Sequence, residues 1–461
     1  MTSPTENVQD GLRLLELKEV EEPWYGFPQI FAQWWIYPLI INAILGLVSF
    51  EYVWYKSRRH RKPIKELDEL MPAFRRIDAH RWSKWRFYIG SFFLWPRCFI
   101  ALTYMAVHCI NCKILFLGHD LNTPVTGFRK WLVYWESRWV AWSWMVFPCF
   151  VWIDWEYVKP EDVNYYEEYL GTREEQAAEQ ADPDRDVSVI PKRGPGNAST
   201  AIANHSGITD IFALISCPLN TGFCAKAGFR HTPVLSWAIN GLQSQYLDRV
   251  DRSKADSQIE GIMKRQNTCE EGADWNPITI FPEGSTTNGT HILKFKKGAF
   301  KSMRTIIPCY VKTSDRFFNQ AWECLPFGHY LTLFVCSMNF WTTKVYIMPE
   351  FTPTLKMLEM HADKGAEEWE IYAECIREAM SKASGKPMLD QPLRDKIVYE
   401  DFMCGDKKEM KVGGKIFRFD KNENGVIEDD PDQEKHELSS KSSRGSKKTR
   451  TSTKNNSRDS D

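Results

Sequence analysis

Residues 199–210 read STAIANHSGITD, and this stretch decides the fold. Its first five residues are an apolar run typical of a buried strand, and a helix is predicted over 210–216. The same alternation continues downstream, with strands predicted over 221–225, 277–281 and 306–311 and a helix over 234–242. The pattern predicts an α/β domain, a mostly parallel sheet flanked by helices.

A histidine and an aspartate, His205 and Asp210, lie at the predicted strand-to-helix junction. On a continuous helix their side chains would point about 140° apart, so contact between them requires the turn that Ser206 and Gly207 permit. A carboxylate that fixes the imidazole tautomer leaves the second ring nitrogen free to take a proton from a hydroxyl. We therefore predict His205 as a general base oriented by Asp210, with a structural histidine and a helix cap as the alternative.

A second polar segment, residues 281–288, reads FPEGSTTN and follows another predicted strand. It places Glu283 beside Gly284, a residue that lets backbone approach a ligand closely. Three lysines follow that could bind phosphate: Lys294, Lys296 and Lys297. An ordinary solvated face is the alternative for these lysines.

The N-terminal third is apolar and holds 14 of the 19 tryptophans, whose amphipathic rings favour membrane interfaces. Within a membrane-associated region over 30–155, residues 30–55 are long enough to span a bilayer. The basic run 56–62 that follows is predicted to be cytosolic, and so is everything after residue 155. Residues 87–117 and 139–153 are predicted to be further spanning or re-entrant segments. Residues 1–29 form an N-terminal segment without the pattern of a signal peptide.

Net charge and cysteine usage exclude some function classes. A net charge of -1 and a pI near 6.8 argue against broad nucleic-acid binding, which needs a basic surface. The 12 cysteines are scattered through apolar stretches, so we expect them to be reduced. Cys109 and Cys112 have the C-x-x-C spacing without a second pair, and we expect core or membrane packing there and no zinc.

The remaining regions frame the α/β domain, which is predicted over 196–385. Residues 156–195 are charged and predicted to be a linker, and the polar residues 432–461 are predicted to be a disordered tail. Within a C-terminal region over 386–431, residues 420–431 partly match a calcium-binding EF-hand loop. Its candidate ligands are Asp420, Asn422, Asn424 and Val426. Pro431 stands where a bidentate glutamate is needed, so calcium binding is doubtful and a degenerate remnant is the alternative.

The motifs, taken in order, resemble a known family. The H-x4-D segment, residues 241–249, the FPEG segment and residues 306–308 are similar to motifs I to IV of the glycerolipid acyltransferases, the superfamily of 1-acylglycerol-3-phosphate acyltransferases. The extended third motif and residues 248–251 most resemble the lysophosphatidylcholine acyltransferases that carry EF-hands. The resemblance covers residues 196–385.

This resemblance implies a membrane-bound acyl-CoA:lysophospholipid acyltransferase. His205 would deprotonate the hydroxyl of a lysophospholipid, which attacks the thioester of acyl-CoA, and no further cofactor is required. Arg249, Glu283 and Gly284 would place the acceptor phosphate, with Glu283 orienting Arg249 or a lysine. The implied partners are acyl-CoA, lysophospholipid and the bilayer, and the implied location is the endoplasmic reticulum membrane with a cytosolic site. Golgi and lipid droplets are alternative locations.

Two other functions stay open on the sequence alone. Glycerol-3-phosphate or 1-acylglycerol-3-phosphate could be the acceptor, because the chemistry at the transferred acyl group is the same. A catalytically idle, calcium-responsive membrane scaffold is the alternative from another class, and the intact His205, Asp210, Glu283 and Gly284 argue against it.

Overall fold

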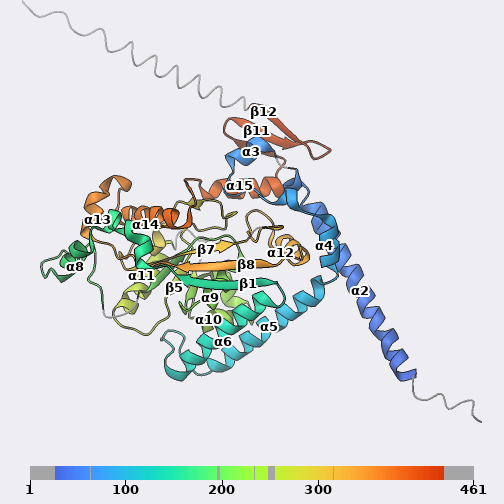
Figure 1. Cartoon of the computed structure of the whole chain (residues 1–461), viewed down its shortest axis with the longest axis horizontal. Coiled ribbons are helices and arrows are strands. Elements are labelled where there is room, and N and C mark those ends of the chain that lie inside the picture. Colours follow the sequence, from blue (N-terminus) through green and yellow to red (C-terminus); the bar gives the residue numbers. More distant parts are fainter. Residues whose placement is uncertain are drawn as a thin grey trace, which may run out of the picture.

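The computed structural model describes residues 26–62, 64–194, 198–232, 234–247, 255–314 and 316–429. The predicted tail over 432–461 lies outside these residues. The described chain forms a central sheet with helices above and below it, a long helix that leaves the body, and a small hairpin unit at the top (Figure 1).

The main sheet of the described chain has seven strands in the order β1-β8-β7-β2-β5-β3-β4. Five of its six neighbouring pairs are parallel, and only β7 and β8 are antiparallel. The strands are β1 (Val151–Tyr157), β2 (Thr200–Ala203), β3 (Gly222–Lys226), β4 (Gln245–Leu247), β5 (Ile278–Ile280), β7 (Ile306–Thr313) and β8 (Trp341–Ile347). The predicted α/β fold with a mostly parallel sheet is confirmed, including the four strands predicted from apolar runs.

Two apolar cores cover opposite faces of this sheet. Along β7, Ile306 and Tyr310 pack into one core and Cys309 and Val311 into the other, as the two-residue period of a strand requires. The first core includes α9 (Ile208–Ser216) and α12 (Phe327–Cys336), and the second includes α14 (Glu368–Ser384). The helix predicted over 234–242 is α10 (Leu235–Gly241).

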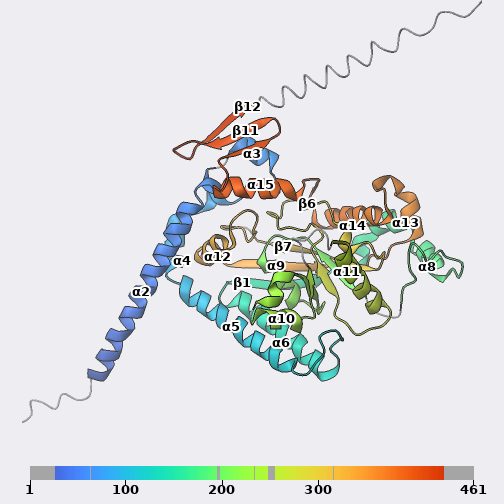
Figure 2. The same ribbon diagram turned by 180° about the vertical axis from the view of Figure 1, so that it is seen from behind.

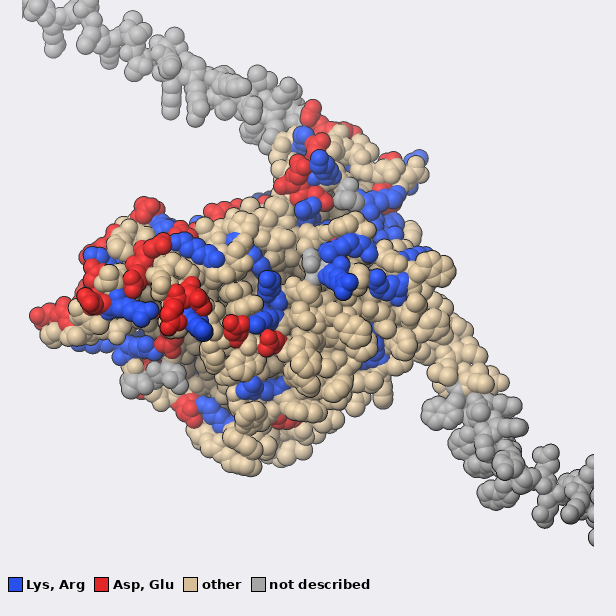
Figure 3. Space-filling model, viewed as in Figure 1, with Lys and Arg blue, Asp and Glu red and all other residues tan. Residues whose placement is uncertain are grey.

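The N-terminal region is helical. It comprises α2 (Gly26–Lys56), α4 (Lys84–Ser91), α5 (Leu94–Leu115) and α6 (Gly127–Val146). Two helices of the described chain are long and apolar enough to cross a membrane. One is Ile36–Lys56, which is part of α2, and the other is α5. In the view of Figure 3 the surface along α2 and below the sheet carries only scattered charged residues, whereas Lys and Arg gather near the upper end of α2.

Residues 87–117 are divided between α4 and α5. Pro96 lies in the first turn of α5, where a missing N–H costs no hydrogen bond. Arg97 is buried in protein, where it donates to the carbonyl oxygens of Val335 at 2.5 Å and of Pro148. The arginine therefore does not face lipid, and the cost of a charge in the bilayer does not arise.

Two predicted segments belong to the α/β domain instead. Residues 139–153, expected to be embedded in the membrane, divide between the end of α6 and β1, whose Val151 and Ile153 are buried in the first core. The expected linker 156–195 holds the 3-10 helix Pro160–Tyr166, α7 (Glu167–Leu170) and α8 (Arg173–Ala181). Tyr169 and Leu170 are buried in the second core, so this stretch is a packed part of the domain.

The C-terminal residues form a third core with the N-terminal segment. The elements are α15 (Leu393–Cys404) and a three-stranded sheet of β10 (Glu409–Val412), β11 (Lys415–Phe419) and β12 (Gly425–Asp429). Their Phe402 and Phe417 are buried with Leu67 of α3 (Lys65–Leu70) and with Phe74. Figures 1 and 2 both show these elements side by side above the main sheet.

The expected calcium loop is the turn of a β-hairpin. Asp420 Oδ1 accepts the backbone N–H groups of Asn422 and Asn424, both at 2.8 Å, and its Oδ2 accepts from the Asn424 side chain at 3.2 Å. Val426 pairs with Arg418 in the β11–β12 ladder. An EF-hand loop leads into a helix, whereas this one leads into a strand, so the sequence match does not produce the ligand geometry.

Candidate active site

The structure brings His205 and Asp210 together at the end of β2 and the start of α9. His205 Nδ1 lies 3.2 Å from Asp210 Oδ2. The Asp210 carboxylate is fully buried, and the same oxygen accepts the backbone N–H groups of Ser206 and Gly207, the latter at 2.8 Å. With the proton of the neutral imidazole on Nδ1 and directed at Asp210, Nε2 is left with its lone pair.

Phe281 fixes the plane of the histidine ring. The two rings stack with their centroids 3.8 Å apart and their planes 10° from parallel. The His205 side chain keeps 17% of its surface exposed, enough for one ring edge to reach a bound molecule. Phe281 is also the residue that opens the FPEG segment, so the two predicted motifs meet at this ring.

Glu283 joins the two motifs through backbone hydrogen bonds. Its Oε1 accepts the His205 N–H at 3.2 Å, and its Oε2 accepts the Leu293 N–H at 3.3 Å. Burial raises the pKa of Glu283 to about 7, although both N–H groups and the ammonium of Lys386 oppose the rise. The expected partner Arg249 lies outside the described residues, and the contacts seen are with backbone.

Gly284 has a backbone conformation that other residues rarely adopt, with φ +75°. Its N–H donates to the Phe281 carbonyl at 3.0 Å, which closes the turn. The Lys296 side chain occupies the space that a Cβ at this position would need. Lys296 therefore lies directly against the turn. Lys297 lies 3.7 Å from Glu367 and over the Trp369 ring, so its neighbours differ from those of Lys296.

Two lysines that sequence reasoning missed approach the site from the C-terminal region. Lys396 of α15 donates to Ser285 Oγ and to both the carbonyl and the hydroxyl oxygen of Thr286, each at 2.8 Å. Burial lowers the pKa of Lys386, while the nearby carboxylates of Glu283 and Asp210 oppose that shift. No local pattern could have found either residue, because both are more than 90 positions away from the segments that they contact.

Residues before the sheet also hold the FPEG segment. The Asn288 side chain donates to the carbonyl oxygens of Pro72 at 2.7 Å and Arg75 at 2.9 Å, and its backbone N–H donates to Ala73 at 2.8 Å. Asn288 opens an N-x-T sequon, but it is buried and its amide is engaged in the fold. The asparagine is therefore structural.

The start of α9 is clamped from outside by a buried ion network. Arg76 donates to Glu323 at 2.9 Å and to the Ala321 carbonyl at 2.8 Å, which fixes the chain there. From this segment the Trp322 N–H donates to the Ser206 carbonyl at 2.6 Å. A Cβ on Gly207 would come within 2.7 Å of the Gln320 carbonyl oxygen, so only glycine allows this approach.

The region that holds this site is similar to known proteins. The family model described as Acyltransferase matches residues 188–312. Over 212 residues the chain is 30% identical to a lysophosphatidylcholine acyltransferase of Drosophila melanogaster, covering 44% of this chain and 37% of that protein. It is 23% identical to the lysophospholipid acyltransferase LPEAT1 of Arabidopsis thaliana, covering 47% and 52%. It is 27% identical to glycerol-3-phosphate acyltransferase 4 of Bos taurus, covering 35% of each.

Among solved structures, the 1-acyl-sn-glycerophosphate acyltransferase PlsC of Thermotoga maritima matches with a TM-score of 0.38 at 15% identity, covering 66% of this chain and all of that one. Residues 188–312 therefore match an acyltransferase domain, and the chain is similar to lysophospholipid acyltransferases, among them a lysophosphatidylcholine acyltransferase. The matched region spans about a third to a half of the length of these relatives.

Proposed function

We propose that the protein is a membrane-bound acyltransferase that moves an acyl group from acyl-CoA to the free hydroxyl of a lysophospholipid. The observation that carries this proposal is the His205–Asp210 contact of 3.2 Å at the end of β2, inside the matched acyltransferase domain. A histidine oriented in this way needs only an acceptor hydroxyl at Nε2 to act as a general base.

The reaction follows from that placement. His205 Nε2 takes the proton of the acceptor hydroxyl while the oxygen attacks the thioester carbonyl carbon. When the tetrahedral intermediate collapses, the carbon–sulfur bond breaks and the proton on His205 passes to the leaving coenzyme A sulfur. The products are an ester and coenzyme A, and the enzyme returns to its starting state. This route requires no acyl-enzyme and no cofactor besides the co-substrate, and Asp210 stabilises the transient imidazolium.

The phosphate of the acceptor is proposed to bind at the FPEG turn. Gly284 has no side chain to obstruct it, and Lys296 lies against the turn with an exposed side chain. Arg249, Lys294 and Lys297 are proposed as further phosphate ligands. Glu283 is proposed to position this site and not to bind phosphate, because its carboxylate does not attract an anion. Its two oxygens accept the backbone N–H groups of His205 and Leu293 and so link the two segments.

Lysophosphatidylcholine is the proposed acceptor, since lysophosphatidylcholine acyltransferases recur among the relatives. Glycerol-3-phosphate and 1-acylglycerol-3-phosphate form the second candidate class, because a glycerol-3-phosphate acyltransferase is also similar to this chain. The apolar helices α2 and α5 support attachment to a membrane. We propose the endoplasmic reticulum, with the site facing the cytosol, because the basic residues that follow α2 favour that side.

The test is an acceptor panel on the full chain in detergent or nanodiscs. Lysophosphatidylcholine, lysophosphatidylethanolamine, lysophosphatidic acid and glycerol-3-phosphate are each supplied with one acyl-CoA, and both coenzyme A release and lipid product are measured. The proposal predicts acceptor-dependent release that is fastest with a lysophospholipid carrying a headgroup. Fastest release with glycerol-3-phosphate would favour the second class, and no transfer with any acceptor would overturn both.

A further inference from the structure

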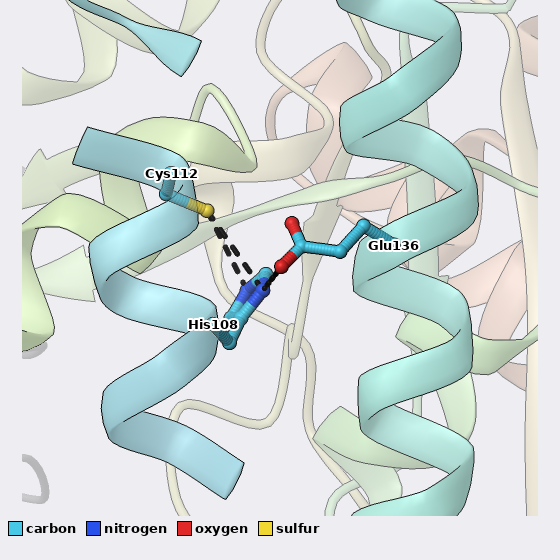
Figure 4. A group of neighbouring side chains, drawn as sticks. All are labelled: His108, Cys112 and Glu136. Carbon is cyan, nitrogen blue, oxygen red and sulfur yellow. Dashed lines mark hydrogen bonds and ion pairs between the residues drawn. The ribbon is translucent and has the colours of Figure 1, made fainter. Parts of the chain in front are cut away.

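A histidine, a cysteine and a glutamate meet between α5 and α6, away from the proposed active site. His108 and Cys112 lie one turn apart on α5, and Glu136 of α6 points toward them across the helix pair (Figure 4). His108 Nδ1 lies 3.3 Å from Glu136 Oε1 and 3.9 Å from Cys112 Sγ. One ligand atom from each of the three residues lies within 4.8 Å of the others.

These separations are close to those in a zinc site. Zinc binds nitrogen and oxygen at about 2.0–2.2 Å and sulfur at about 2.3 Å, so the ligand atoms of a tetrahedral site lie roughly 3.3–3.8 Å apart. Both distances measured from His108 Nδ1 are near that range, and small side-chain rotations would close the remainder. Thiolate and imidazole together select zinc over magnesium or calcium, which prefer oxygen ligands.

The two ligands on α5 face the protein. Cys112 and His108 are buried, whereas Ile110 and Ile114 on the same helix are exposed. A Cβ on Gly241 at the end of α10 would come within 2.7 Å of Cys112 Sγ, so α10 closes the site on one side. The cluster therefore lies where three helices join.

Glu136 has a buried oxygen that no described residue satisfies. Asn111 Nδ2 donates to Oε1 at 2.8 Å, which orients the carboxylate, while Oε2 is buried without a hydrogen-bond partner in the described chain. A bound cation would satisfy that atom. An ion also has a route in, because Glu136 lines an open groove of about 520 Å³ together with Leu132 and Trp135.

We propose that His108, Cys112 and Glu136 bind one zinc ion, leaving its fourth position open to water. Cys112 binds as the thiolate, so its proton is released to solvent when zinc binds. The ion would tie α5 to α6 beside α10. The C-x-x-C spacing was expected to reflect packing, and both cysteines are buried. In the proposed site the partner of Cys112 is His108, one helical turn earlier, and not Cys109.

The first test measures zinc in the full-length protein purified in detergent from zinc-supplemented medium and dialysed against metal-free buffer. We expect about one zinc per chain in the wild type and in Cys109→Ser, which alters a buried cysteine next to His108. Cys112→Ser, His108→Asn and Glu136→Gln are each expected to lose most of it. A wild type without zinc, or equal zinc in Cys112→Ser, would overturn the proposal and leave a plain contact between His108 and Glu136.

A second measurement does not depend on how the variants fold. Wild-type protein stripped of metal is titrated with Co²⁺, and its absorption spectrum is recorded. A thiolate ligand in a tetrahedral site gives a sulfur-to-cobalt charge-transfer band in the near ultraviolet and intense visible bands. We expect both to saturate at about one equivalent and to disappear when zinc is added. Absence of the charge-transfer band in the wild type would contradict thiolate binding.

Discussion

At the residue scale, Asp210 does two things with one oxygen. The atom that contacts His205 also accepts the N–H groups of Ser206 and Gly207, so the carboxylate orients the imidazole and shapes the turn that carries it. Its burial excludes water from the contact and strengthens the electrostatic effect of the carboxylate on the ring.

Asp210→Asn is expected to lower kcat by about 10²–10⁴-fold. An amide can accept from the imidazole through its oxygen, but it carries no charge to stabilise the imidazolium that forms during proton transfer. The measurement is coenzyme A release at saturating acceptor. Asp274→Asn, which changes an exposed aspartate beside Lys130, serves as the control. Unchanged turnover in Asp210→Asn would mean that this carboxylate serves folding alone.

Glu283 is expected to make stability depend on pH. Burial raises its folded pKa to about 7, against about 4.3 in an unfolded chain. Between these values the folded state binds more protons than the unfolded state, so the contribution of Glu283 to the free energy of unfolding falls as pH rises. Glu283→Gln removes this titration. We expect its Tm, relative to the wild type, to increase from about pH 5 to about pH 8, whereas a pH-independent difference would refute the shift.

At the element scale, the start of α9 depends on a close approach between two chain segments. Gly207→Ala would press a Cβ against the Gln320 carbonyl oxygen and is expected to cost about 1–3 kcal/mol and to move His205 from its place. Gly261→Ala is the matched control, because that glycine is exposed on α11 (Ala255–Glu270) with open space around it. The free energy of unfolding of Gly261→Ala should rise by up to about 1 kcal/mol. The free energy of unfolding of both variants is measured with denaturant. Equal changes in the two variants would contradict the close approach of Gly207 to the Gln320 carbonyl oxygen.

Sequence spacing predicted the parts of the site that are local. His205, Asp210 and the FPEG turn were found because each motif lies within a few residues of a strand end. Lys396 was missed because it reaches Ser285 from a helix 111 residues away. β1 was missed for the same reason, because its parallel partner β8 begins far along the chain, at Trp341. Its apolar run belongs to the sheet but resembled a membrane segment. The partial EF-hand match did not give a calcium site because it covers the ligand positions of the loop but not the exit helix that an EF-hand requires.

At the scale of the whole molecule, the acyltransferase region is not a separable block. The sheet takes its edge strand β1 from residues before 196, and the FPEG segment is held by residues 72–75 and by α15. A fragment of residues 196–385 is therefore expected to be insoluble or protease-sensitive, because it exposes the β8 edge and the apolar faces that α6 and α15 cover. Limited proteolysis compared with the full chain measures this. A stable, active fragment would contradict the packing described.

The role of His205 is tested most directly by comparing His205→Ala with His361→Ala in acyl transfer from acyl-CoA to lysophosphatidylcholine. His361 contacts the Glu168 carbonyl and the Tyr169 ring, so its loss controls for removing a histidine elsewhere. We expect His205→Ala to lose at least about 10²-fold in coenzyme A release and in lipid product, while His361→Ala keeps both. Equal transfer by His205→Ala and the wild type would contradict the role of His205 as the general base.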